Sequence, residues 1–287
     1  MILLALLSAT VMLMGVVLGW QGVRWLVKEL FLENPTFALQ TIEVQNNGFI
    51  LPDQVRQWAA VKPGDNLLAL DLDRLKRNLE KVPFIREATV ERVMPRALIL
   101  RVAEREPCAQ IVFTQTLPAE GAGRTVTAYL DAHGFVLPPW EGVRVSRPPG
   151  ESWQALPTLV GVNPAELRRA QPVVSPPVQA ALRLIAAFDQ SAMPEVEDLD
   201  RIDLSAPGLL QVTTGQGVQV SLGWDDLAGQ LRRWRLVYDY SLTCGKCIAS
   251  LDLSVTNNLP VRWVAAESAP AVPPRAPPPS RNRRHHV

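Results

Sequence analysis

The chain opens with a nearly unbroken apolar run from Ile2 to Trp20, and no Lys, Arg, Asp or Glu precedes Arg24. At about 1.5 Å per residue, an uncharged helix over residues 1–23 is long enough to cross a hydrocarbon layer of roughly 30 Å. A cleaved signal peptide would carry a basic start and a small-residue cleavage site, and this run has neither. The pattern therefore predicts one uncleaved membrane span over residues 1–23, followed by a linker over residues 24–36.

The next segment, residues 37–106, predicts the order strand, helix, helix, strand, strand. Alternation from Thr41 to Gln45 is typical of a half-buried strand, and Pro52 suits the first turn of a helix. Asp71 is a good N-cap for a second helix. The predicted apolar positions are Leu72, Leu75, Leu79 and Val82 on that helix, and Ala88, Val90, Leu98, Leu100 and Val102 on the two strands that follow.

The segment after Pro107 is rich in strand patterns and contains two amphipathic helices. The strands are predicted at 129–138, as a hairpin, at 156–161, at 209–222, as a second hairpin, and at 248–255. The helix residues predicted to face the sheet are Val178, Leu182 and Ile185, and then Leu227, Leu231, Trp234 and Tyr238. The fold class is therefore α+β.

Several of these patterns occur together in one order. The motifs are Gly64-Asp65-Asn66-Leu67-Leu68, Val82-Pro83-Phe84-Ile85, Val102-Ala103-Glu104-Arg105-Glu106-Pro107, Leu222-Gly223-Trp224-Asp225 and Leu251-Asp252-Leu253. In this order, behind an amino-terminal span, they resemble the FtsQ/DivIB cell-division family. The resemblance implies a POTRA domain at residues 37–106 and an FtsQ-type β domain at residues 107–264.

The resemblance also implies a function. It predicts a non-enzymatic scaffold of the bacterial divisome, held in the inner membrane by one span, with a cytoplasmic amino terminus and periplasmic domains at the division septum. The partners would be FtsB/FtsL-type coiled-coil proteins and other divisome membrane proteins, which links the scaffold to septal peptidoglycan synthesis. The family match places the partner contacts at Val255, Asn257, Asn258 and Trp263. A strand at a sheet edge offers unpaired backbone groups to which a partner segment can pair.

Charge near the span favours the opposite orientation only weakly. Arg24 and Lys28 follow the span and nothing basic precedes it, so a literal positive-inside count places the domains in the cytoplasm. A cytoplasmic segment omitted by a late start codon would restore the usual pattern. We therefore expect the periplasmic orientation that the family resemblance implies.

Composition limits the class of partner. Lys plus Arg total 29 and Asp plus Glu total 28, without a basic stripe interleaved with aromatics, so a nucleic-acid partner is not expected. Residues 265–287 form a Pro-rich basic tail that is predicted to be disordered.

No catalytic, cofactor or metal site is predicted, and no small-molecule substrate. The chain has 3 histidines, of which His133 lies in a predicted turn and two lie in the tail, so no His-based metal or nucleophile set can be assembled. Asp131, Asp203 and Asp252 are expected to be turn and strand-end residues.

The motif Cys244-Gly245-Lys246-Cys247 has a chemical alternative. A redox C-x-x-C motif normally precedes a helix, whose amino terminus lowers the first thiol's pKa, whereas this one follows a predicted helix. A disulfide is expected, with two free thiols and catalysis as the other possibilities. Cys108 is expected to be buried.

Two other functions compete with the scaffold. An outer-membrane assembly or transport factor is one, because POTRA domains also occur there, but too few alternating strands follow residue 106. A periplasmic thiol oxidoreductase acting through Cys244 and Cys247 is the other, and an insulin-reduction assay separates it from the scaffold.

Overall fold

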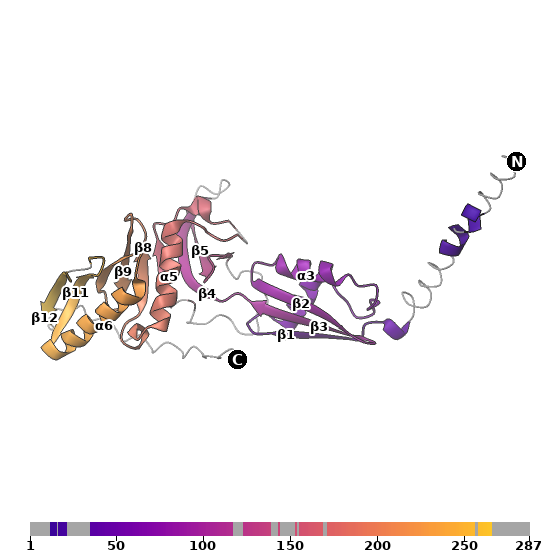
Figure 1. The fold of residues 1–287 in the computed structure, drawn as a ribbon, viewed down its shortest axis with the longest axis horizontal. Helices are drawn as coiled ribbons and strands as arrows, with labels where there is room; N and C mark the ends of the chain where they lie inside the picture. The colour runs from indigo at the N-terminus through magenta and orange to yellow at the C-terminus, as the bar shows by residue number, and fades with distance from the viewer. Residues whose placement is uncertain are drawn as a thin grey trace. The chain divides into compact units, whose positions relative to one another are not determined.

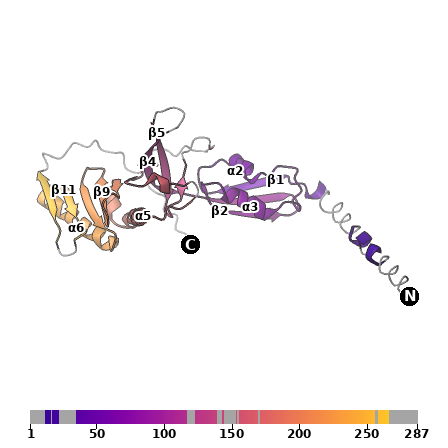
Figure 2. The same cartoon turned by 90° about the horizontal axis from the view of Figure 1, so that it is seen from above.

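The computed structural model contains two compact units (Figure 1, Figure 2). Contacts within the chain divide it between Glu104 and Arg105. The structure describes residues 12–15, 17–21, 35–116, 123–138, 143, 153, 155–168, 171–255 and 258–265.

Short helical pieces at residues 12–15 and 17–21 belong to the apolar run at the start of the chain. Within the described residues, no helix combines the length and the hydropathy that crossing a membrane requires. The predicted span over residues 1–23 lies largely outside the described residues, and the predicted tail over residues 265–287 lies almost entirely outside them. Both stay predictions.

The first unit has the predicted order of strand, helix, helix, strand and strand. Its elements are η2 Pro35–Phe37, β1 Thr41–Asn46, α2 Pro52–Ala59, α3 Leu72–Glu80, β2 Ile85–Val93 and β3 Ala97–Glu104. The central strand, β3, is parallel to β1 and antiparallel to β2. Helices α2 and α3 pack against each other and against β1 and β2, so they cover one face of this sheet (Figure 2).

Local signals place these helices as predicted. The Asp71 carboxylate accepts a hydrogen bond from the Arg74 amide at 3.0 Å and caps α3, while Pro52 occupies the first turn of α2. The predicted apolar positions of α3 form a stripe that faces the sheet, and two of them, Leu75 and Leu79, are buried. The predicted inward positions of β3 are also buried, namely Leu98, Leu100 and Val102.

A buried carboxylate at the end of β3 fixes the loop between β1 and α2. The Glu104 side chain accepts hydrogen bonds from the Asn46 side chain at 2.9 Å and from the amides of Phe49 and Ile50 at 2.8 and 3.0 Å. The Glu104 amide in turn donates to the Asn47 side chain at 2.8 Å. Hydrogen bonds to an ionised carboxylate are stronger than neutral ones, so Glu104 holds the entry to α2 in place.

The second unit is one mixed sheet with helices. Its strands are β4 Pro107–Thr116, β5 Gly123–Asp131, β6 Val136–Leu137, β7 Thr158–Val160, β8 Leu199–Asp203, β9 Leu209–Thr214, β10 Gln219–Gly223, β11 Lys246–Asp252 and β12 Val261–Ala265. Its helices are η3 Pro164–Glu166, α5 Pro176–Gln190, η4 Met193–Glu195 and α6 Leu227–Cys244. Among the described residues, the strand order across the sheet is β12-β11-β10-β9-β8-β7-β4-β5-β6.

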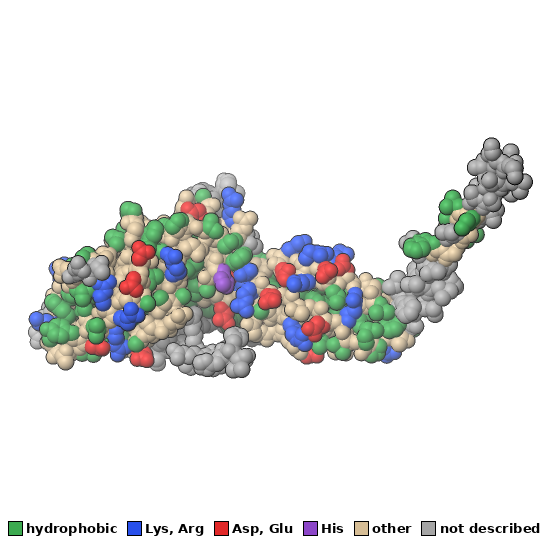
Figure 3. All heavy atoms as spheres, viewed as in Figure 1, with side chains coloured by type: hydrophobic (Ala, Val, Ile, Leu, Met, Phe, Trp, Pro, Cys, Tyr) green, Lys and Arg blue, Asp and Glu red, His purple; other side chains and the backbone are tan. Residues whose placement is uncertain are grey.

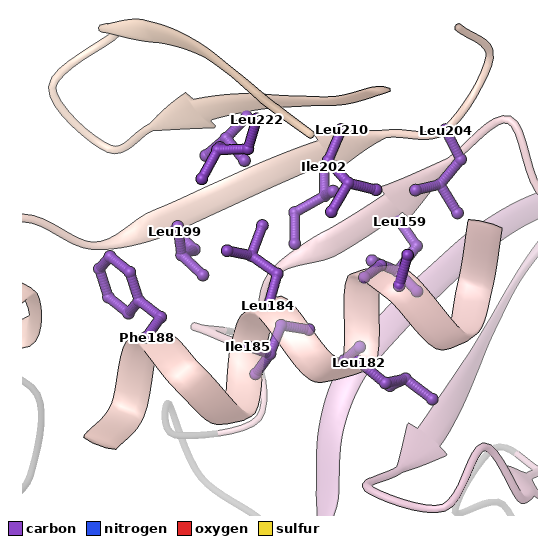
Figure 4. Close-up of a cluster of buried hydrophobic side chains, with 14 of the residues drawn as sticks. Leu159, Leu182, Leu184, Ile185, Phe188, Leu199, Ile202, Leu204, Leu210 and Leu222 are labelled. Atoms are coloured by element: carbon purple, nitrogen blue, oxygen red, sulfur yellow. The ribbon is translucent and has the colours of Figure 1, made fainter. Parts of the chain in front are cut away.

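The core of this unit lies between the sheet and helices α5 and α6. The two helices pack against each other and against strands of the same sheet, so they cover one face of it (Figure 1). Leu184 of α5 points toward Leu199 and Ile202 of β8 (Figure 4). The rings of Phe188 and Trp234 lie 6.1 Å apart and join the two helices. Burial of these large apolar side chains drives the packing of the helices on the sheet.

The opposite face of the sheet is polar and open. One row of cross-strand neighbours runs from β8 to β12 through Arg201, Thr213, Gln219, Ser250 and Arg262. The next row runs through Asp203, Gln211, Ser221 and Asp252. Both rows line an open hollow of about 620 Å³. An antiparallel or mixed sheet tolerates one solvated face, so this alternation is sufficient to explain the polar side.

The sequence patterns missed β4, β8 and β12, and they misplaced the ends of β11. A register shift interrupts the alternation in β8, between Leu199 and Arg201. A bulge moves the following side chains to the other face, so a strict two-residue period is lost. The predicted strand 248–255 is β11, which ends at Asp252.

Glu197 is a carboxyl group buried beside α6. Burial raises its pKa from the ordinary 4.5 to about 7, although a hydrogen bond with Thr214 opposes that shift. Its charge also contributes to raising the pKa of Tyr238 on α6, after the larger effect of burial. The folded state therefore favours the protonated form of Glu197, and the unfolded state releases this proton at lower pH.

Leu75→Asp should unfold the first unit, because it places a charge in the buried stripe of α3. The expected loss is several kcal/mol, from lost packing and an unpaired buried carboxylate. Lys76→Asp on the exposed side of the same helix is the matched control and should be mild. Thermal unfolding followed by circular dichroism measures both variants, and equal melting temperatures would show that the stripe is misassigned.

Glu197→Gln should stabilise the second unit at pH 8 and change little at pH 4. The raised pKa of Glu197 means that its contribution to the free energy of unfolding is fully present below pH 4.5 and is lost as the pH rises through about 7. A neutral Gln removes this fall, which amounts to roughly 3 kcal/mol at 1.36 kcal/mol per pKa unit. Thermal unfolding against pH measures it, with the exposed Glu195→Gln as control. Parallel pH profiles of wild type and Glu197→Gln would contradict the assignment.

Candidate partner-binding edge

Strand β12 forms one end of the large sheet. It pairs antiparallel with β11 on its inner side, and no other described strand pairs with its outer side. The strand predicted at 248–255 is therefore not the last strand of the sheet, because β12 lies beyond it. The exposed end of the sheet is Val261–Ala265, which follows Pro260.

The hydrogen-bond pattern shows which backbone groups of β12 face outward. The Asp252 amide donates to the Pro260 carbonyl at 3.0 Å, which makes Leu251 and Val261 a non-hydrogen-bonded pair. The backbone N–H and C=O groups of successive residues point to alternate sides of an antiparallel strand. Those of Arg262 therefore face β11, and those of Val261 and Trp263 face away from it.

The side chains of β12 give its two faces different chemistry. Val261 and Trp263 pack against the core on the α6 side, and the rings of Trp263 and Tyr240 lie 6.1 Å apart. Arg262 and Val264 alternate to the other face, where Arg262 is exposed. Hydrophobic side chains lie among charged ones at the α6 end of the unit (Figure 3), and the exposed apolar residues of α6 are Leu236, Tyr240 and Leu242.

The segment that leads from β11 to β12 is tied to α6. The Arg233 side chain donates to the carbonyls of Leu253 and Val255, each at 3.0 Å. The Asp252 carboxylate accepts from the amide and hydroxyl of Ser254 at 3.0 and 2.6 Å. These bonds turn the chain out of β11 and fix where β12 begins.

The four predicted contact residues have different positions. Trp263 lies in β12 and is half-buried, whereas Val255 is 43% exposed and lies outside both strands, beyond the end of β11. Asn258 is exposed, and Asn257 lies outside the described residues. The sequence interpretation missed Tyr240 and Arg262, although the alternation of apolar and basic residues from Val261 to Val264 is a strand signal.

The three candidate aspartates have separate structural roles. Asp131 is buried and paired with Arg105 at 2.8 Å. Hydrogen bonds from Ser205 lower the pKa of Asp203. Asp203 and Asp252 are three strands apart, about 14 Å at 4.8 Å per strand, which is too far to share a proton. Within the described residues, no group of His, Cys, Asp and Glu side chains has the arrangement of a metal site.

The cysteines of the C-x-x-C motif are unbonded in the structure. Cys244 is the exposed last residue of α6, and Cys247 is a half-buried residue of β11. The structure therefore describes the dithiol form, and the disulfide stays a prediction. Cys108 is half-buried against the core rather than fully buried as predicted.

Comparison with known proteins matches both units. The family model described as "POTRA domain, FtsQ-type" matches residues 37–105, and the model described as "Cell division protein FtsQ/DivIB, C-terminal" matches residues 122–254. The first match lies almost entirely in the first unit and the second match almost entirely in the second unit.

Curated relatives extend over most of the chain. "Cell division protein FtsQ" of Syntrophotalea carbinolica is 27% identical over 241 residues, which cover 83% of this chain and 78% of that protein. The protein of the same description from Rhodothermus marinus is 29% identical over 258 residues, covering 88% and 85% of the two chains. Since the family models and these relatives agree with the predicted resemblance, this chain belongs to the FtsQ/DivIB family of cell division proteins.

Proposed function

We propose that this chain is a non-enzymatic scaffold of the divisome that captures FtsB/FtsL-type partners through the outer side of β12. One span anchors it in the inner membrane, and its POTRA and β domains are periplasmic at the septum, where the captured partners connect it to septal peptidoglycan synthesis. The observation that carries the proposal is the outer side of β12, on which the peptide groups of Val261 and Trp263 face away from the sheet.

The chemistry of β12 specifies the partner segment. Backbone pairing to β12 satisfies donors and acceptors on both chains, which gives affinity without a particular sequence. Side chains next to Trp263 and Tyr240 on the α6 side should be apolar, because those rings already form an apolar surface. Side chains opposite Arg262 should be acidic, because opposite charges pair favourably across neighbouring strands.

The two competing functions receive less support. The family match over residues 122–254 favours a cell-division role over an outer-membrane assembly or transport factor. Cys244 is the last residue of α6, whereas a redox C-x-x-C motif normally lies at the amino terminus of a helix, so the pair lacks the placement that an oxidoreductase uses.

The proposed topology predicts that alkaline phosphatase fused after Val287 is active in cells, because this enzyme folds correctly only outside the cytoplasm. The matched control is a cytoplasmic reporter at the same position, which should be silent. An active cytoplasmic reporter with an inactive phosphatase would place both domains in the cytoplasm and refute the topology.

Trp263→Ala should weaken capture of a purified FtsB/FtsL-type pair about 30-fold, because truncating an aromatic at an interface often costs about 2 kcal/mol. The melting temperature should change little, since Trp263 is only half-buried. Val174→Ala, which truncates another exposed apolar side chain in the loop before α5, should leave capture unchanged.

Binding and melting together decide the role of Trp263. A Trp263→Ala protein that melts early and still captures the pair would show that the side chain only covers the protein's own core.

A further inference from the structure

The two cysteines of the C-x-x-C motif lie on the two elements that hold β12 in place. Cys244 is in α6 and Cys247 is in β11. Cys247 is the cross-strand neighbour of Val264, and the adjacent pairs are Lys246 with Ala265 and Ile248 with Trp263. Cys247 is therefore a residue of β11, the strand that holds β12 in the sheet.

Cys244 reaches β12 through α6. A hydrogen bond with the Cys244 thiol raises the pKa of the Tyr240 hydroxyl, and the Tyr240 ring packs edge-on against Trp263 at 6.1 Å. The Cys244 thiol is thus linked through Tyr240 to the aromatic pair beside β12.

The two thiols lie on different sides of the start of β11. Ile248 is buried in the core beneath α6, so alternation along the strand places Cys247 on the opposite face. Cys244 belongs to the helix layer. A disulfide needs the two β-carbons about 3.5–4.5 Å apart, with their bonds directed toward each other, which cysteines on opposite faces cannot achieve without backbone movement.

Two movements close the bond, and each disturbs β12. If Cys247 turns toward α6, the pairs of Lys246 and Cys247 with β12 are lost, because a strand residue that changes face leaves its register. If the last turn of α6 unwinds instead, Tyr240, which packs on Trp263, loses its hydrogen bond with the Cys244 thiol. Gly245, at φ 61°, supplies a linker residue that accepts either change at low conformational cost.

We propose that Cys244 and Cys247 form a reversible redox site that loosens β12 when oxidised, so that only the dithiol form presents the partner-binding edge. The inference rests on the proposed function for its effect on binding, but not for the opening of β12. The oxidant is a disulfide donor, either a dithiol oxidoreductase in its oxidised form or a small disulfide.

The chemistry is thiol–disulfide exchange. The exposed Cys244 thiolate attacks the donor disulfide, forms a mixed disulfide and releases one donor thiol. The Cys247 thiolate then attacks the Cys244 sulfur, forms the intramolecular disulfide and releases the second donor thiol. The protein loses two electrons and two protons, and the donor disulfide gains them. A dithiol reductase in its reduced form, or an added small thiol, reverses both steps and returns the two electrons and two protons to the protein.

The test uses the full-length Cys108→Ser protein in detergent micelles, equilibrated with reduced or oxidised glutathione. Alkylation and mass spectrometry count the free thiols, hydrogen exchange of the peptide over residues 258–265 reports opening of β12, and capture of a purified FtsB/FtsL-type pair reports binding. Cys244→Ser in the same background is the matched control, because Cys244 is exposed and the substitution conserves its size.

Oxidation should remove both thiols, speed exchange in β12 about tenfold and weaken capture about tenfold, since backbone pairs each contribute modestly to stability. The Cys244→Ser control should show neither the faster exchange nor the weaker capture. Thiols that stay free at the most oxidising ratio, or a disulfide that forms without faster exchange, would overturn the proposal. If the reduced protein fails to capture the pair, the partner assignment fails, and the exchange measurement alone decides the redox site.

Discussion

The outer side of β12 is the constraint on which the second unit depends, because a sheet must end and its last strand leaves backbone groups unpaired. Exposed edges invite indiscriminate pairing, and proteins limit this with prolines, charges, bulges and short strands. Pro260 precedes β12, Arg262 lies within it, and β11 has a register shift between Ile248 and Ser250. These features narrow the usable edge to a few outward peptide groups, which favours a selective partner over self-association.

Much of the first unit could be predicted from its sequence because each boundary has a local cause. Asp71 caps a helix, and the alternation in β3 matches a sheet with one covered face. In the second unit, β8 escaped prediction because a bulge shifts its period, and β12 escaped because it spans only 5 residues. A short strand gains its stability from its neighbour rather than from its own pattern.

The candidate site was only partly predictable for a related reason. Trp263 carries its own signal, an aromatic close to the end of a folded region. Val255 lost its predicted place because the chain turns out of β11 at Asp252, through hydrogen bonds to Ser254 that no period reports. Tyr240 could not be found, since its role comes from a contact between α6 and β12 that only the tertiary fold creates.

The same contacts that fold this edge would also preform it for the proposed partner. Trp263 is already held against Tyr240 and the core, and Arg233 fixes the turn that precedes β12. Ordering side chains and loops is a main cost of association, so a preformed edge leaves most of that cost to the partner segment. A partner that is unstructured before binding pairs with such an edge by adopting its strand conformation. Under the proposed function, the affinity for a partner therefore depends on how firmly α6 and β11 support β12, and a change that acts on that support would control binding most strongly.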